Sequence, residues 1–165
     1  MMNHQEITTK DKLDVLKEIA QKFNHHQVRW NLGASCMLYL RHIVSDFNDI
    51  DILIHEEDVD KVKHIMKLYP ILQKEKSPEK YRTKEFLNYM IRGVSIDIMA
   101  RFSIVSDEKT YDFPLSQQDI SEYVVLDHTK IYLSSIKDWY HYYTLMKRID
   151  KIKLLKEYMK KHPNE

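Results

Sequence analysis

The spacing of apolar residues along the chain switches between helical and extended patterns, which predicts an α+β fold. Where apolar residues recur every three or four positions we expect amphipathic helices, and where they alternate or form short β-branched runs we expect strands. The helical segments are residues 10–23, 34–43, 57–69 and two stretches between 135 and 161. The strand segments are residues 28–32, 48–54, 86–91, 94–102, 123–126 and 130–133.

The order of these segments predicts one domain. The chain has 165 residues, which is enough for a single sizeable core. We expect this core in residues 10–133, followed by a C-terminal helical pair in residues 135–161. Arg92-Gly93 predicts the turn of a β-hairpin, whose two strands are then antiparallel neighbours. Residues 71–80 are expected to form a charged connection.

Three aspartates lie inside the predicted strands. Asp49 and Asp51 interrupt the apolar run NDIDILI, and Asp97 interrupts VSIDIM. Because successive side chains of a strand point to opposite faces, the isoleucines point one way and the aspartates the other. Carboxylates gathered on an open face without His or Cys suit Mg²⁺ or Mn²⁺ better than zinc. Either aspartate motif alone is more often structural, so the preceding segment decides the interpretation.

A glycine turn precedes the first aspartate pair. The predicted strand 28–32 runs directly into Gly33, and a helix follows from Ala34. Backbone N–H groups at the start of a helix attract anions, and the Ser35 hydroxyl adds a donor. The chain contains only two glycines, so each is expected where a side chain would obstruct the backbone. Together with the carboxylates, this turn predicts a phosphate-binding site next to a metal site.

The three segments WNLGASCMLYLRH, NDIDILI and VSIDIM resemble the nucleotidyltransferase superfamily. The superfamily signature is an apolar residue, a glycine, then glycine or serine, followed by Asp-x-Asp on the next strand and a third acid on a later strand. The resemblance is to the small single-domain members, including minimal and antibiotic-modifying nucleotidyltransferases. It implies a mixed β-sheet with helices packed on one face and a C-terminal helical pair.

The resemblance also implies roles for individual residues. Gly33, Ala34 and Ser35 would form the turn that holds the phosphates of a nucleoside triphosphate. Asp49 and Asp51 would coordinate two Mg²⁺ or Mn²⁺ ions, while Asp97 would complete the second metal site and help deprotonate the attacking hydroxyl. The basic residues expected to stabilise the triphosphate are Arg41, Lys147, Arg148 and Lys151.

The activity implied is metal-dependent transfer of a nucleoside monophosphate, expected to be AMP from ATP, to a hydroxyl of a small molecule or protein, with release of pyrophosphate. Two alternatives stay open: an antitoxin-like protein that binds a toxin partner, and a decayed nucleotide-binding module. Ala34 and His42 keep the last alternative open, because many members have glycine at these positions. Aromatic residues of the first C-terminal helix could stack on a base or acceptor ring, and Tyr142 is expected to be the most exposed of them.

Composition narrows the class of partners. The 26 basic and 25 acidic residues give a formal charge of +1, which argues against bulk binding of nucleic acid. No apolar stretch is long enough to span a bilayer, and no secretion signal is recognisable near the start. We therefore expect a cytoplasmic location. The chain has a single cysteine, Cys36, so an internal disulfide is excluded. The lack of partner cysteines also argues against a structural zinc site.

Overall fold

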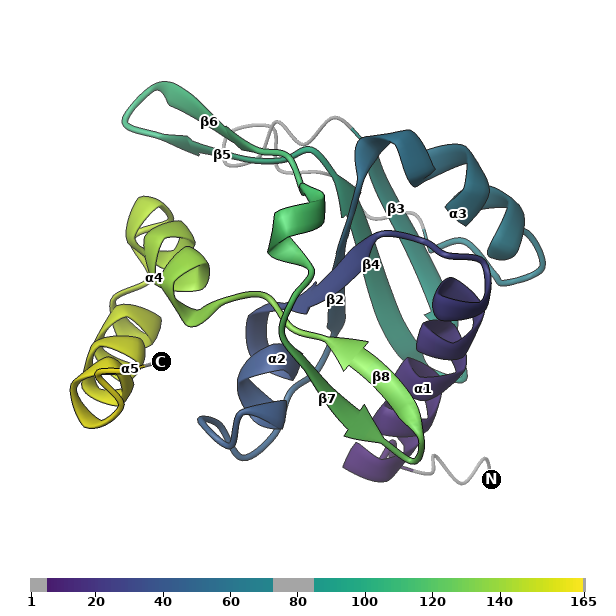
Figure 1. Cartoon of the computed structure of the whole chain (residues 1–165), viewed down its shortest axis with the longest axis horizontal. Helices are drawn as coiled ribbons and strands as arrows, with labels where there is room; N and C mark the ends of the chain where they lie inside the picture. The colour runs from purple at the N-terminus through teal and green to yellow at the C-terminus, as the bar shows by residue number, and fades with distance from the viewer. Residues whose placement is uncertain (1–5, 73–84, 165) are drawn as a thin grey trace.

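A four-stranded mixed sheet forms the centre of the protein in the computed structural model, which describes residues 6–72 and 85–164 (Figure 1). Its strand order is β1-β2-β4-β3. The pair β1·β2 is antiparallel, β2·β4 is parallel and β3·β4 is antiparallel. The strand bounds are β1 (Trp30–Gly33), β2 (Ile50–Ile54), β3 (Glu85–Ile91) and β4 (Val94–Ala100). This arrangement confirms the predicted fold class and the hairpin at Arg92-Gly93.

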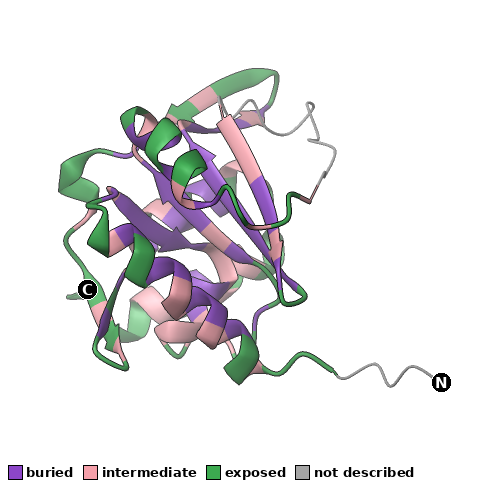
Figure 2. Cartoon of the chain, turned by 90° about the vertical axis from the view of Figure 1, so that its right-hand side faces the viewer, coloured by how far each residue is buried: buried purple, intermediate pink, exposed green. Residues whose placement is uncertain are grey.

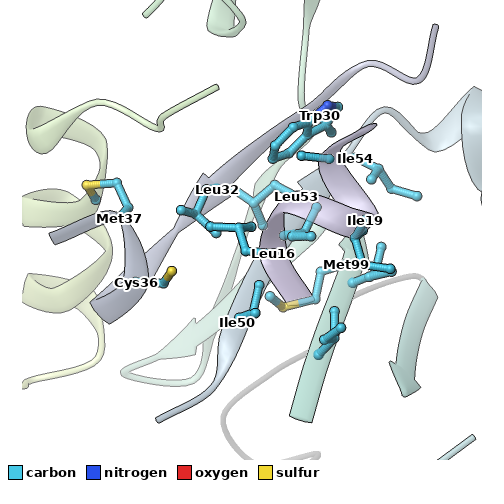
Figure 3. Close-up of a cluster of buried hydrophobic side chains, with 14 of the residues drawn as sticks. Leu16, Ile19, Trp30, Leu32, Cys36, Met37, Ile50, Leu53, Ile54 and Met99 are labelled. Atoms are coloured by element: carbon cyan, nitrogen blue, oxygen red, sulfur yellow. The ribbon is translucent and has the colours of Figure 1, made fainter. Parts of the chain in front are cut away.

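Helix α1 (Thr9–His25) covers the isoleucine face of the sheet. Its first turn is held by a capping box, in which the Thr8 hydroxyl accepts from the Asp11 N–H while the Asp11 carboxylate accepts from the Thr8 N–H. Phe23 at the other end meets the ring of Trp30 at a centroid distance of 6.0 Å. Figure 3 shows side chains of α1 converging with those of β1 and β2 in one apolar cluster. Burial of this face fixes which way every strand residue points.

Two further helical segments connect β1, β2 and β3. Helix α2 (Ala34–Leu40) follows β1 without a loop, and helix α3 (Val59–Ile65) follows β2 after a 3₁₀ turn (Glu56–Asp58). Residues 70–72 then lie along the outer edge of β3, where the Leu72 N–H donates to the Asn88 carbonyl oxygen at 2.9 Å. Most of the predicted charged connection 71–80 lies outside the described residues.

Two small hairpins extend from the sheet, and the sequence predicted both strands only for the second. They are β5 (Phe102–Ser106) with β6 (Lys109–Phe113), and β7 (Tyr123–Leu126) with β8 (Thr129–Tyr132). The predicted strand 94–102 is wrong at its end, because Arg101 at φ 53° separates β4 from β5. Both hairpin turns use non-glycine residues at positive φ, namely Asp107, Glu108, Asp127 and His128.

The C-terminal helical pair is α4 (Ile136–Leu145) and α5 (Ile149–Lys161). The Ser135 hydroxyl caps α4 by accepting from the Asp138 N–H at 3.1 Å. The two helices lie beyond β5 and α2 (Figure 1). The central strands are largely buried (Figure 2). Within residues 6–72 and 85–164, no helix has the length and apolar character needed to cross a bilayer.

Candidate active site

One residue from each central strand lies in a single row across the sheet. In strand register, Gly33 pairs with Asp51, Asp51 with Asp97, and Asp97 with Asn88. Paired residues of neighbouring strands point to the same face. The row therefore places two carboxylates side by side, with a glycine on one flank and an amide on the other.

The three predicted aspartates lie in three different environments in the structure. Asp97 is 9% exposed in the middle of β4, and Asp51 is half-buried in β2. Asp49 is exposed and lies in the bend just before β2, not inside the strand as predicted. Among the described residues, no group of three His, Cys, Asp or Glu side chains is arranged to hold a metal ion. The sheet itself thus brings together two of the three predicted acids.

Asn88 is a member of this row that the sequence analysis missed. It is 6% exposed, and its amide nitrogen donates to the Asp97 carboxylate and, at 3.4 Å, to the Ile96 carbonyl oxygen. The signal was present in the sequence, because a two-residue turn at Arg92-Gly93 places residue 88 opposite residue 97.

Gly33 is required by a side chain from the C-terminal pair. A Cβ atom at this position would lie 2.2 Å from Cζ2 of the Trp139 indole, so any side chain would collide with the ring. Trp139 is 3% exposed and stacks on Phe102 at a centroid distance of 6.0 Å. Its indole Nε1 is buried and has no hydrogen-bond partner within the described residues. Helix α4 therefore borders the carboxylate face beside β1.

The two departures from the superfamily pattern both adopt backbone conformations that glycine favours. Ala34 has φ 51° and His42 has φ 64°. At His42 the reason is the end of α2: its N–H donates to the Tyr39 carbonyl oxygen and the next N–H, of Ile43, donates to that of Leu38, both at 2.9 Å. These two bonds form a Schellman motif. The His42 position thus serves the helix end, whereas Ala34 lies in the turn next to the carboxylates.

One of the four predicted basic residues lies beside the turn. The Lys151 ammonium donates to the Ser35 hydroxyl at 3.4 Å, which connects α5 to the start of α2. Burial lowers the pKa of Lys151, and the charge of Arg148 one turn earlier lowers it further. A cation that is partly desolvated in this way gains from an anion placed next to it.

The other three basic residues contact protein groups. Arg41 donates to the Ser134 carbonyl oxygen at 2.7 Å and pairs with Glu122 at 2.8 Å. Lys147 pairs with Asp107 at 2.6 Å, and Arg148 pairs with Asp150 at 3.4 Å. Arg41 therefore ties α2 to the segments around β7 and β8. Lys147 and Arg148 lie on exposed surface in the connection between α4 and α5.

The expectation that Tyr142 is the exposed aromatic residue is wrong. Tyr142 is 7% exposed, with its ring centroid 4.5 Å from that of Phe113 and 5.4 Å from that of Phe102. Burial raises the pKa of its phenol. Since both phenylalanines belong to the β5·β6 hairpin, which the sequence analysis did not predict, the partners of Tyr142 were missing.

Comparison with known proteins gives a result at the level of fold. No protein-family model matches the sequence, and no curated protein sequence matches it. A candidate nucleotidyltransferase from Thermotoga maritima has a similar structure, with a TM-score of 0.72 and 22% identity over 97% of this chain and 99% of that chain. Thus the similarity spans both proteins almost completely.

Two antibiotic-modifying enzymes are also similar in structure. The lincosamide adenylyltransferase LnuA, solved with lincomycin bound, gives a TM-score of 0.57 and 18% identity over 92% of this chain and 98% of that chain. ANT(2″)-Ia, solved in complex with adenylyl-2″-tobramycin, gives 0.57 and 14% identity over 87% of both chains. This chain therefore has the fold of nucleotidyltransferases, as the sequence motifs predicted.

Proposed function

We propose that this protein is a metal-dependent nucleotidyltransferase that moves AMP from ATP to a hydroxyl of a small molecule or protein and releases pyrophosphate. The observation that carries the proposal is the register pairing of Asp51 with Asp97 on one face of a nucleotidyltransferase-type sheet, beside Gly33. Two aspartates paired across a parallel ladder suit a site that receives a divalent cation, because like charges at that spacing repel. A divalent cation would relieve the repulsion.

The donor set fits Mg²⁺ or Mn²⁺. Its members offer oxygen atoms, which these cations prefer, and they include the carboxylates of Asp51 and Asp97 in adjacent strands. Asp49, two residues before Asp51, would reach the same cations from the bend at the start of β2. When bound, two such ions supply charge neutralisation at the phosphates and lower the pKa of an acceptor hydroxyl.

The residues of the chain itself would bind and orient the reactants. Lys151 and the Ser35 hydroxyl, already within 3.4 Å of each other, would share the charge of the triphosphate. The acceptor oxygen would form a bond to the α-phosphorus as the bond to pyrophosphate breaks, and Asp97 would take the hydroxyl proton on its carboxylate. In this arrangement the protein contributes chiefly position and charge neutralisation.

Adenylyl transfer is favoured over other nucleotides by the structural neighbours. LnuA is an adenylyltransferase, and the ligand seen with ANT(2″)-Ia is an adenylylated antibiotic. Both solved ligands are small molecules, so a small hydroxylated acceptor is the first choice to test. A cytoplasmic location, where ATP and Mg²⁺ are plentiful, would suit this activity.

The direct test is to incubate the protein with α-labelled ATP, GTP, CTP or UTP, Mg²⁺ and a cell extract, and to identify the labelled product. We expect label from ATP to enter one acceptor with stoichiometric release of pyrophosphate, and the Asp51→Asn variant to be inactive. Labelling that is equal in the variant would refute the proposed site. Nucleotide binding without any transfer would instead favour the decayed module, and stable complex formation with a toxin without transfer would favour the antitoxin.

A further inference from the structure

Asn88 holds a buried carbonyl oxygen that no other residue in 6–72 or 85–164 uses as an acceptor. The orientation of its amide is fixed by chemistry, because both neighbours of the amide nitrogen, the Asp97 carboxylate and the Ile96 carbonyl, are acceptors. Oδ1 therefore bonds to neither of these two acceptors. This atom is buried and has no hydrogen-bond partner within the described residues. Burying an unpaired acceptor costs free energy, so an unpaired one beside a candidate catalytic acid needs an explanation.

A second buried asparagine in the same sheet shows the usual solution. Asn31 in β1 is 2% exposed, and both ends of its amide are paired. Its Oδ1 accepts from the Ser134 hydroxyl at 2.8 Å, and its Nδ2 donates to the Asp119 carbonyl oxygen at 3.2 Å. The sheet can thus satisfy a buried amide completely, and at Asn88 it satisfies only the nitrogen.

We propose that Asn88 is a positioning residue of the cation site, whose amide nitrogen orients Asp97 and whose carbonyl oxygen accepts a hydrogen bond from the water shell of a divalent cation held by Asp51 and Asp97. This inference rests on the proposed function, since it needs a cation at the paired carboxylates. It explains why a neutral amide occupies the fourth position of the row Gly33, Asp51, Asp97 and Asn88. A neutral oxygen adds a partner for the hydrated cation without adding repulsion in the empty site.

The test measures Mn²⁺ affinity by electron paramagnetic resonance, with the full chain and Mn²⁺ alone. Asn88→Leu keeps the shape and removes both polar ends, so we expect Mn²⁺ binding to weaken roughly tenfold to a hundredfold. Asn88→Asp keeps an oxygen toward the cation and adds charge beside Asp97. This variant should melt earlier without metal, bind Mn²⁺ at least as tightly as the wild type, and gain more in melting temperature from Mn²⁺.

Two control variants distinguish failure of the role of Asn88 from failure of the proposed cation site. Asn31→Leu also removes a buried amide, and it should lower the melting temperature while leaving Mn²⁺ affinity unchanged. Asp51→Asn should abolish Mn²⁺ binding. If Asp51→Asn abolishes binding but Asn88→Leu binds Mn²⁺ as tightly as the wild type, only the role of Asn88 is overturned. If the wild type binds no Mn²⁺, or Asp51→Asn binds it normally, the cation site and this inference both fail.

If Asn88→Leu does not fold, the role of Asn88 is tested with Asn88→Ser and Asn88→Asp. Serine is too short to reach the cation shell from the same backbone position, so Mn²⁺ affinity should fall as expected for leucine. A purely structural role for Asn88 predicts lower melting temperatures in both variants with wild-type Mn²⁺ affinity, and that pattern would refute the proposal.

Discussion

Strands β2 and β4 present isoleucines to one face of the sheet and carboxylates to the other. On the first face, Ile52 pairs with Ile98 under α1, and both are fully buried. On the second face, one residue along each strand, Asp51 pairs with Asp97. The same backbone ladder therefore carries a close-packed core and a cluster of charge, separated only by the alternation of side chains.

The comparison shows how a small fold can place two acidic side chains next to each other. Burial of the isoleucines directly behind them stabilises the ladder that carries them, at about 1.5 to 3 kcal/mol for each fully buried side chain. Changes on the isoleucine face should thus alter stability and change transfer only through unfolding. Substitution of Asp51 or Asp97 on the other face should instead reduce transfer and have little effect on stability.

The largest effect is expected from Asp97→Asn. The substitution keeps the shape of the side chain and removes the charge, so nucleotidyl transfer should fall by several orders of magnitude while the fold persists. Pyrophosphate release and thermal denaturation, measured on the same preparation, check this. A large loss of stability, or transfer at the wild-type rate, would show that Asp97 is a structural residue and that the two faces do not differ in the way described.

On the opposite face, Ile52→Ala should lower the free energy of unfolding by about 3 to 4 kcal/mol, because it leaves a cavity at a fully buried site. Ile52→Val, which removes one methylene group, should cost about 1 kcal/mol. Urea denaturation measures both. At a temperature where each variant is folded, the rate of transfer should remain near that of the wild type, and a selective loss of transfer in Ile52→Val would break the comparison.

The sequence predicted this two-faced arrangement because it depends on local rules. Alternation orients Asp51 and Asp97, and the two-residue turn at Arg92-Gly93 sets the register of β3 on β4. The parallel pairing of β2 with β4, which brings the two aspartates opposite each other, is a long-range choice. No local pattern predicts this pairing, and the resemblance to a known family implied only that the sheet is mixed.

What the sequence did not predict depends on contacts between distant segments. The β5·β6 hairpin turns at Asp107-Glu108 without a glycine, so its turn signal is weak. Without this hairpin the burial of Tyr142 could not be foreseen. In the same way, the position of Trp139 over Gly33 requires α4 to return to β1, a contact between segments about a hundred residues apart that no local pattern encodes.

A buried aspartate outside the row sharpens the comparison. Asp58 is 3% exposed and accepts three hydrogen bonds from Arg29, from the backbone N–H at 2.8 Å, Nε at 3.1 Å and Nη2 at 3.0 Å. Burial alone would raise the pKa of Asp58, but the bonds from Arg29 outweigh it and hold this pKa below its usual value. Asp58 is thus a buried acid whose charge is neutralised by the fold itself.

We expect Asp58→Asn to lower the free energy of unfolding by about 2 kcal/mol and to leave transfer unchanged. This is less than the roughly 3 to 5 kcal/mol of a fully buried pair, because the Arg29 side chain is 32% exposed. Since the folded pKa is depressed, the stabilisation is complete above the unfolded pKa of about 3.9 and is lost as pH falls through the folded pKa. Urea denaturation should therefore show a smaller stability loss below about pH 4 in Asp58→Asn than in the wild type. If both proteins lose the same unfolding free energy below about pH 4, the pKa of Asp58 is not depressed in the folded protein.

The smallest expected effects distinguish the two positive-φ residues at either end of α2. Glycine at either position relieves backbone strain but adds unfolded-state entropy, so Ala34→Gly and His42→Gly should each stabilise the protein by only about 0.5 kcal/mol. The effects of these two substitutions on ATP affinity should differ. Ala34 lies in the turn beside Ser35 and the carboxylates, where removal of a methyl group would let a phosphate approach the backbone. Ala34→Gly should therefore bind ATP a few-fold more tightly than the wild type. His42 lies in the Schellman motif at the far end, so its variant should bind ATP like the wild type. Isothermal titration of both variants with ATP and Mg²⁺ checks this, and equal affinities would mean that the phosphates do not contact the turn after Gly33.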